Sequence, residues 1–164
     1  MAPTTAPIDQ LRAQLADFLD WHGAHADFDA AVKGVPPEHR GAQAEGFPHT
    51  LWQLLEHMRL TQRDILDFCR DPHYEEPKWP DDYWPRTAAP PTAGAWDESV
   101  AAFRADLEAM QRLAADPAVD LFAKVPHGTG QTYLREVLVV ADHNSYHVGQ
   151  LVALRRLLGI WKEA

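Results

Sequence analysis

This 164-residue sequence lacks the features of a disulfide-linked protein and of a nucleic-acid-binding protein. Its single cysteine, Cys69, excludes an internal disulfide. Acidic residues outnumber lysine and arginine 24 to 15, the formal net charge is −9, and no face rich in lysine and arginine is visible. Because a phosphate backbone is bound by clustered cations, we expect no nucleic-acid partner. We interpret the one local basic pair, Arg155 and Arg156, as salt-bridged helix surface.

Signals for membranes and for secretion are missing as well. No uninterrupted apolar run reaches the length that spans a bilayer. Residues 1–7 have neither the basic start nor the apolar centre of a signal peptide. The sequence therefore predicts a cytoplasmic protein with no membrane partner.

Several common catalytic signatures are also absent. There is no glycine-rich phosphate loop, no His-Glu-x-x-His pattern and no nucleophile-elbow serine. The positions three residues before His143 and His147 hold Val140 and Asn144, so the Glu-x-x-His pairs of di-iron bundles are missing. These absences count against those classes of enzyme.

Four amphipathic segments with helical periodicity are present, and no strand pattern of any strength. Four such helices predict an all-α fold, a four-helix bundle in a single domain over residues 1–164. The connections after the second and third helices are long enough to cross the bundle, so simple up-down topology is not assured. The expected helices run from Pro7 as far as Val32, from Thr50 with a Gln53 capping box to Asp71, from the stretch 92–96 to Asp116, and from Thr132 to Gly159.

Residues 71–91 differ from the rest of the chain. Six prolines forbid regular structure there, while two tyrosines and two tryptophans argue against disorder. We interpret the stretch as a long ordered loop packed on the body of the protein, covering the core rather than acting as a substrate lid.

The residues most able to carry chemistry lie between Asp142 and Gln150. His143 and His147 are four residues apart, on a helical stripe that also holds valines and leucines. An i,i+4 pair shares a face and can bind one metal ion, although two satisfied core histidines would show the same pattern. A catalytic site adds a third ligand and an open position. The second helix offers His57, at the margin of its apolar stripe.

Two stretches together resemble the DinB/YfiT-like superfamily: Leu54-Leu-Glu-His57-Met-Arg-Leu, and later Asp142-His143-x-x-Tyr146-His147-x-Gly149-Gln150. The resemblance implies a four-helix bundle with a divalent metal held at one end by His57, His143 and His147. Three neutral imidazoles suit zinc, nickel, iron or copper, of which zinc and nickel are favoured.

Characterised members of that superfamily suggest what the metal would do. They include metal-dependent thiol transferases that use bacillithiol or mycothiol, and a mycothiol-dependent maleylpyruvate isomerase. The resemblance therefore implies a thiol S-transferase or hydrolase acting on a small electrophilic substrate, with a low-molecular-weight thiol as cofactor. The alternative is a non-catalytic metal-binding or stress-response bundle whose structural metal has a fourth protein ligand. A homodimer fits either case.

Other polar residues are assigned by their place on the helices. Glu136 and Gln150 share the histidine stripe and Tyr146 flanks it, so each is a candidate to orient a ligand imidazole or a bound water. Glu56 neighbours His57 and therefore points elsewhere. We interpret the remaining candidates as structural or solvated, namely the buried thiol Cys69 and the pair His22 and His25 on the first helix.

Overall fold

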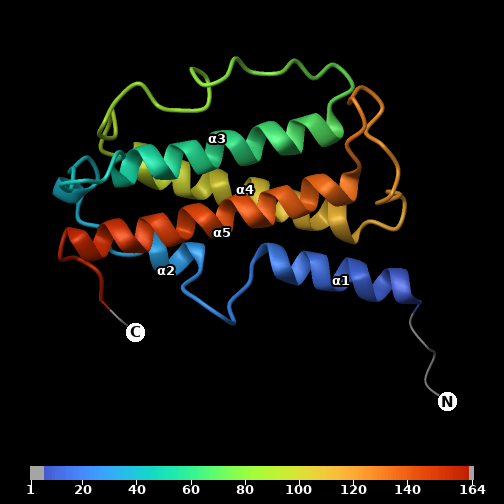
Figure 1. The fold of residues 1–164 in the computed structure, drawn as a ribbon, viewed down its shortest axis with the longest axis horizontal. Coiled ribbons are helices and arrows are strands. Elements are labelled where there is room, and N and C mark those ends of the chain that lie inside the picture. The colour runs from blue at the N-terminus through green and yellow to red at the C-terminus, as the bar shows by residue number, and fades with distance from the viewer. Residues whose placement is uncertain (1–5, 163–164) are drawn as a thin grey trace.

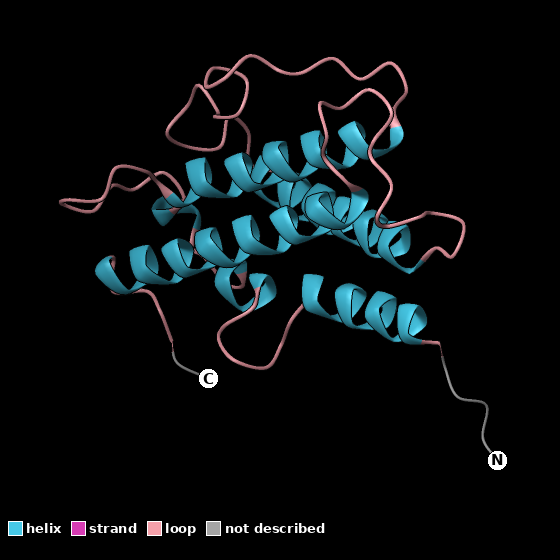
Figure 2. Ribbon diagram, turned by 45° about the vertical axis from the view of Figure 1, so that its right-hand side comes forward, coloured by secondary structure: helices cyan, strands magenta, loops and turns pink. Residues whose placement is uncertain are grey.

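Four long helices and two short ones make up the regular structure of the computed structural model, which describes residues 6–162 (Figures 1 and 2). No strand occurs among the described residues, so the prediction of an all-α fold is confirmed. The helices are α1 (Pro7–Leu19), α2 (Phe28–Val32), the 3-10 turn η1 (Pro37–His39), α3 (Leu51–Arg70), α4 (Ala95–Ala115) and α5 (Tyr133–Leu157).

The starts of the two helices that carry the candidate histidines agree with the sequence prediction. The Gln53 N–H donates to Thr50 Oγ1 at 3.2 Å, and the Thr50 N–H donates to Gln53 Oε1 at 3.0 Å. This is the predicted capping box of α3. Thr132 caps α5 by accepting from the Arg135 N–H at 3.2 Å. After α5 the chain turns at Gly159, whose φ of +71° suits a residue without a side chain.

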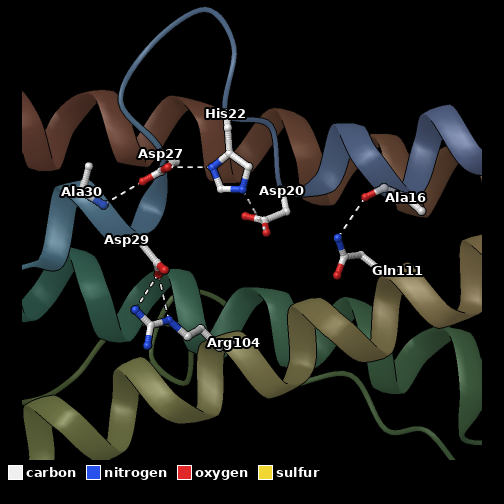
Figure 3. Close-up of polar contacts among 8 residues, drawn as sticks. All are labelled: Ala16, Asp20, His22, Asp27, Asp29, Ala30, Arg104 and Gln111. Atoms are coloured by element: carbon white, nitrogen blue, oxygen red, sulfur yellow. Dashed lines mark hydrogen bonds and ion pairs between the residues drawn. The ribbon is translucent and has the colours of Figure 1, made fainter.

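The prediction of one continuous helix over residues 7–32 is wrong. Helix α1 ends at Leu19, and α2 begins only after Asp27, whose carboxylate accepts from the Ala30 N–H at 2.7 Å. The same carboxylate is 2.7 Å from His22 Nδ1 (Figure 3). An N-cap residue has non-helical backbone angles, so the cap at Asp27 interrupts the helix at that point. The apolar periodicity of the sequence nevertheless continues through the break.

The broken N-terminal segment is tied to α4 by side chains from both halves. The Gln111 amide of α4 donates to the Ala16 carbonyl of α1 at 2.9 Å, and Arg104 pairs with Asp29 of α2 at 2.6 Å (Figure 3). Arg12 is buried and donates to the Ala114 carbonyl at 3.1 Å. Helices α1 and α2 are therefore fixed on the bundle despite the break.

The long connection from α3 to α4 returns along the length of α3. Figure 1 shows α3 and α4 starting at the same end of the bundle, with the connection over residues 71–94 running back along the outer side of α3, while α5 runs in the opposite direction. This crossover places the loop beside the first turns of α3. None of the helices in the described part of the chain is both long enough and apolar enough to cross a membrane.

Packing of α3, α4 and α5 forms the apolar core, and α1 covers α4. Leucine and valine side chains dominate it, and Phe28 of α2 stacks on Phe103 of α4 with ring centroids 3.9 Å apart. The largest fully buried apolar side chains include Phe103, Leu51, Leu54, Leu55, Met58, Leu66, Met110, Leu121, Leu151 and Leu154.

Candidate metal centre

Three histidines from two helices meet at the seam between α3 and α5. His57 lies on the second turn of α3, and His143 and His147 lie one turn apart in the middle of α5. One nitrogen from each ring lies within 4.8 Å of the others, and His143 Nε2 is 3.1 Å from His57 Nε2. His57 and His147 are buried and His143 is half-buried. The structure thus brings together the three residues that the sequence singled out.

Hydrogen bonds fix the protonation of two of these rings. His57 Nδ1 is 2.8 Å from the Tyr83 carbonyl, and His147 Nδ1 is 2.7 Å from Gln150 Oε1. Because a carbonyl oxygen only accepts, both Nδ1 atoms carry the proton and both Nε2 atoms keep a lone pair. In the metal-free protein the His57 Nε2 lone pair accepts a hydrogen bond from His143 Nε2 at 3.1 Å, so a metal ion would take the place of this bond. His143 Nδ1 is buried and has no hydrogen-bond partner among the described residues.

The environment of the cluster keeps the imidazoles neutral. Burial, together with the neighbouring His147 and His57, lowers the pKa of His143 to about 3. Burial likewise lowers the pKa of His147 to about 4, and that of His57 below its ordinary value. A metal ion requires the neutral form, so the site holds its ligands ready for one.

The loop over residues 71–91 contributes directly to the cluster, which sequence reasoning missed. Trp84 stacks on His57 with ring centroids 3.9 Å apart and an interplanar angle of 3°. His49 stacks on the same tryptophan at 4.1 Å. The carbonyl that accepts from His57 belongs to Tyr83, the residue before Trp84. The expectation that this loop only covers the core is therefore too narrow, because the loop orients one of the three histidines.

Two tyrosine hydroxyls anchor this loop to α3. Tyr74 and Tyr83 donate to the two oxygens of the Asp64 carboxylate at 2.7 and 2.8 Å. Burial raises the pKa of both tyrosines, and the bond to Asp64 raises it further. Both hydroxyls therefore stay protonated and donate at any physiological pH.

The candidates for orienting a ligand are placed unequally. Gln150 contacts His147, and its amide nitrogen lies 3.2 Å from the Tyr146 hydroxyl. The Tyr146 ring also packs edge-on against His147, with ring centroids 4.9 Å apart. Glu136 is buried two turns before His143, and its carboxylate is 2.7 Å from Arg135. Glu56 accepts from Arg59 and from Ser99, directed away from the histidines as expected.

Two other interpretations made from the sequence meet different outcomes. Cys69 is buried, and burial raises the pKa of its thiol to about 12, so the view of it as a small apolar side chain agrees with the structure. Arg155 was expected on the helix surface, and this is wrong. Its side chain is buried and donates to the carbonyls of Ala30 and Ala31 at 2.9 and 2.8 Å, because α2 ends against it.

The cluster fits a metal ion by its donors and by its spacing. Tetrahedral ligation at about 2.0 Å separates neighbouring nitrogens by roughly 3.3 Å, close to the 3.1 Å between His143 and His57. In the described part of the chain the group contains three histidines and no fourth histidine, cysteine or carboxylate. Three protein ligands leave a coordination position for a water or a substrate.

The fold and the site define the class of this protein as a helical bundle with a three-histidine cluster between two of its helices. Comparison with known families narrows this class to one family, because the model of the DinB superfamily matches residues 20–151. The chain belongs to the DinB superfamily. No curated protein and no solved structure gave a significant match.

The metal-free protein should lose stability as the pH falls below about 6.5, the ordinary pKa of histidine. In the unfolded chain the three imidazoles take up protons there, while the folded protein, with lowered pKa values, does not. The unfolded state then binds more protons, so the free energy of unfolding decreases with falling pH. His143 and His147 together lower it by about 2 kcal/mol between pH 6.5 and 5.5, and His57 adds to this in the same direction. Urea unfolding across this range measures the slope. A His147→Leu variant should show a shallower slope of unfolding free energy against pH. The control His73→Ala, which removes an exposed histidine, should leave the slope unchanged. Equal slopes in wild type and both variants would contradict the assignment of the pH dependence to the histidine cluster.

Proposed function

We propose that this member of the DinB superfamily is a metal-dependent enzyme in which His57, His143 and His147 hold one divalent ion. The observation that carries the proposal is the convergence of three neutral imidazoles, two buried and one half-buried, with ligand nitrogens within 4.8 Å of one another. Zinc or nickel suits these donors best among the candidates, with iron and copper as alternatives.

The number of ligands supports a catalytic site over a structural one. A structural zinc site is closed by four protein ligands, whereas a catalytic site has three and an open position. The described residues supply three. When bound, the ion would lower the pKa of a thiol or water in the open position and so make a nucleophile available at neutral pH.

The surrounding residues would serve that chemistry by holding the ligands still. The Tyr83 carbonyl and Gln150 Oε1 fix the rings of His57 and His147, and Trp84 covers one face of His57. As the reaction we propose transfer of a low-molecular-weight thiol to a small electrophile, in which the thiolate sulfur forms the new bond and the leaving group of the electrophile departs with its electron pair. Hydrolysis of that electrophile is the other form of the reaction. The thiol is supported by the family resemblance, and a homodimer remains part of the proposal.

Cobalt substitution tests the open position. Protein loaded with one equivalent of cobalt should develop a sulfur-to-cobalt charge-transfer band when cysteine or another small thiol is added, because the thiolate enters the free position. Methionine, which has no thiol, is the matched control and should leave the spectrum unchanged. A cobalt spectrum that does not respond to any thiol or to azide would show a closed site, and the structural alternative would replace this proposal.

A further inference from the structure

A second concave site lies on the opposite side of α5 from the histidines. It is a groove of about 1060 Å³ between α2, α5 and the segment that follows α5, which lie together in Figure 1. Ser145, Val148 and Val152 line it, and at 100° per residue these positions lie roughly 100–180° around α5 from His143 and His147. The groove is therefore separate from the candidate metal centre.

The charge of the groove is opposite to that of the whole protein. Four cationic residues line it, Lys33, Arg155, Arg156 and Lys162, together with His25. None of its described lining residues is acidic, in a chain with a formal net charge of −9. Two of the chain's four lysines thus lie around one groove. Cations gathered in a concave surface raise the local concentration of anions.

A buried arginine in the wall adds an independent observation. Arg155 is 5% exposed, and its hydrogen-bond partners among the described residues are the backbone carbonyls of α2 and of Ile160. Its Nε is buried without a hydrogen-bond partner, and none of the ion pairs among the described residues includes this arginine. Buried arginines normally have a counter-charge. An anion in the groove would place a negative charge near this guanidinium, because Arg155 is part of the wall.

The rest of the lining is apolar or aromatic. Val148, Val152, Ile160 and Trp161 contribute to it, and Arg155 lies over the Trp161 ring at 5.0 Å. A side-chain carbon added at Gly149 would meet nothing within 4 Å, so the surface of α5 is open at that point. The walls can therefore contact a hydrocarbon body while the cations contact a charged group.

We propose that this groove binds a small organic anion, with the acidic group against Lys33 and Lys162 and an apolar body against Val152 and Trp161. The ligand class is an aromatic or aliphatic carboxylate, sulfonate or phosphate ester. The binding site is separate from the metal centre and does not depend on the proposed reaction.

Fluorescence titration with 8-anilinonaphthalene-1-sulfonate tests the proposal on the full chain. Its neutral relative N-phenyl-1-naphthylamine has a similar apolar body without the sulfonate. The variant Lys33→Gln/Lys162→Gln should weaken binding of the sulfonate at least tenfold. The control Lys78→Gln/Lys124→Gln changes the net charge equally with the two lysines outside the groove, and should alter the affinity less than twofold. The neutral probe should bind both variants alike.

Other outcomes would overturn the proposal. Equal weakening by both lysine pairs would mean that only the net charge matters, and equal affinity for the two probes would mean that the anion is not recognised. Displacement of the sulfonate by inorganic phosphate as readily as by octanoate would remove the role of the apolar wall. A doubled mass in sedimentation that returns to the monomer in Lys33→Gln/Lys162→Gln would show that a second copy of the chain fills the groove. An Ala153→Glu variant, which adds a carboxylate at an exposed wall position, should abolish binding of the sulfonate.

Discussion

Replacing any one of His57, His143 and His147 by alanine should reduce metal affinity at least about a hundredfold. Binding of a structural zinc is worth roughly 10–16 kcal/mol shared among its ligands, so the loss of one ligand costs about 3 kcal/mol or more. The measurement is metal content by inductively coupled plasma mass spectrometry after dialysis against zinc or nickel, on protein purified without an affinity tag or a chelator. Wild type should hold one equivalent and the three variants little or none.

The matched control for these variants is His73→Ala, which removes an exposed histidine of the loop and should keep the full equivalent. The cluster makes the three ligands interdependent, because each ring lies within 4.8 Å of the others. Metal kept by His57→Ala but lost from His143→Ala would assign the ion to α5 alone with a different third ligand. A wild type that takes up no zinc or nickel would end the metal-enzyme proposal and leave three neutral core histidines.

The sequence predicted those parts of the fold that local patterns determine. The capping box at Thr50 and Gln53 and the apolar stripe behind it are contained within one helix, so α3 could be placed from them. The break after Leu19 could not be placed in this way. The apolar period of α1 continues past it, and the cap on Asp27 that starts α2 outweighs that period. Helix propensity and apolar periodicity are averages over many residues, so they do not locate a break that is set by one side-chain cap at a single position.

The candidate site likewise has a part that local pattern predicts and a part that depends on contacts between distant segments. His143 and His147 are one turn apart, so their common face follows from the helix alone. His57 looked marginal because its wheel position was judged against α3 only. In the fold that margin is covered by Trp84, which is 27 positions later in the chain, and the carbonyl of Tyr83 beside it is a backbone group that no side-chain pattern marks. The family resemblance identified the histidine, and the crossover of residues 71–94 explains its burial.

Asp64 connects this loop to the cluster, and its replacement by alanine should be costly. The carboxylate accepts hydrogen bonds from the Tyr74 and Tyr83 hydroxyls, and the Tyr83 carbonyl in turn accepts a hydrogen bond from His57 Nδ1–H. Two hydrogen bonds to a charged group are worth roughly 1.5–3 kcal/mol each, and Tyr83 is buried, so its hydroxyl would be left unpaired. We expect Asp64→Ala to lower the free energy of unfolding by about 3 kcal/mol and the metal affinity by about tenfold, the lower end for a group that orients a ligand.

Two further variants separate the role of Asp64 from a general loss of stability. Asp64→Asn keeps an oxygen that accepts from one tyrosine and an amide that can donate to the other, so it should restore most of the stability and the metal affinity. Asp67→Asn removes a carboxylate one turn later that pairs with Arg63 and Arg70 on the same exposed face, and should cost less than about 1 kcal/mol with metal affinity unchanged. Urea unfolding of the metal-free proteins and competitive zinc titration give the two quantities separately. If Asp64→Ala lowers stability while zinc affinity stays at the wild-type value, the loop covers the site without orienting His57, and the hydrogen bond from His57 to the Tyr83 carbonyl must then form independently of the tyrosine anchor.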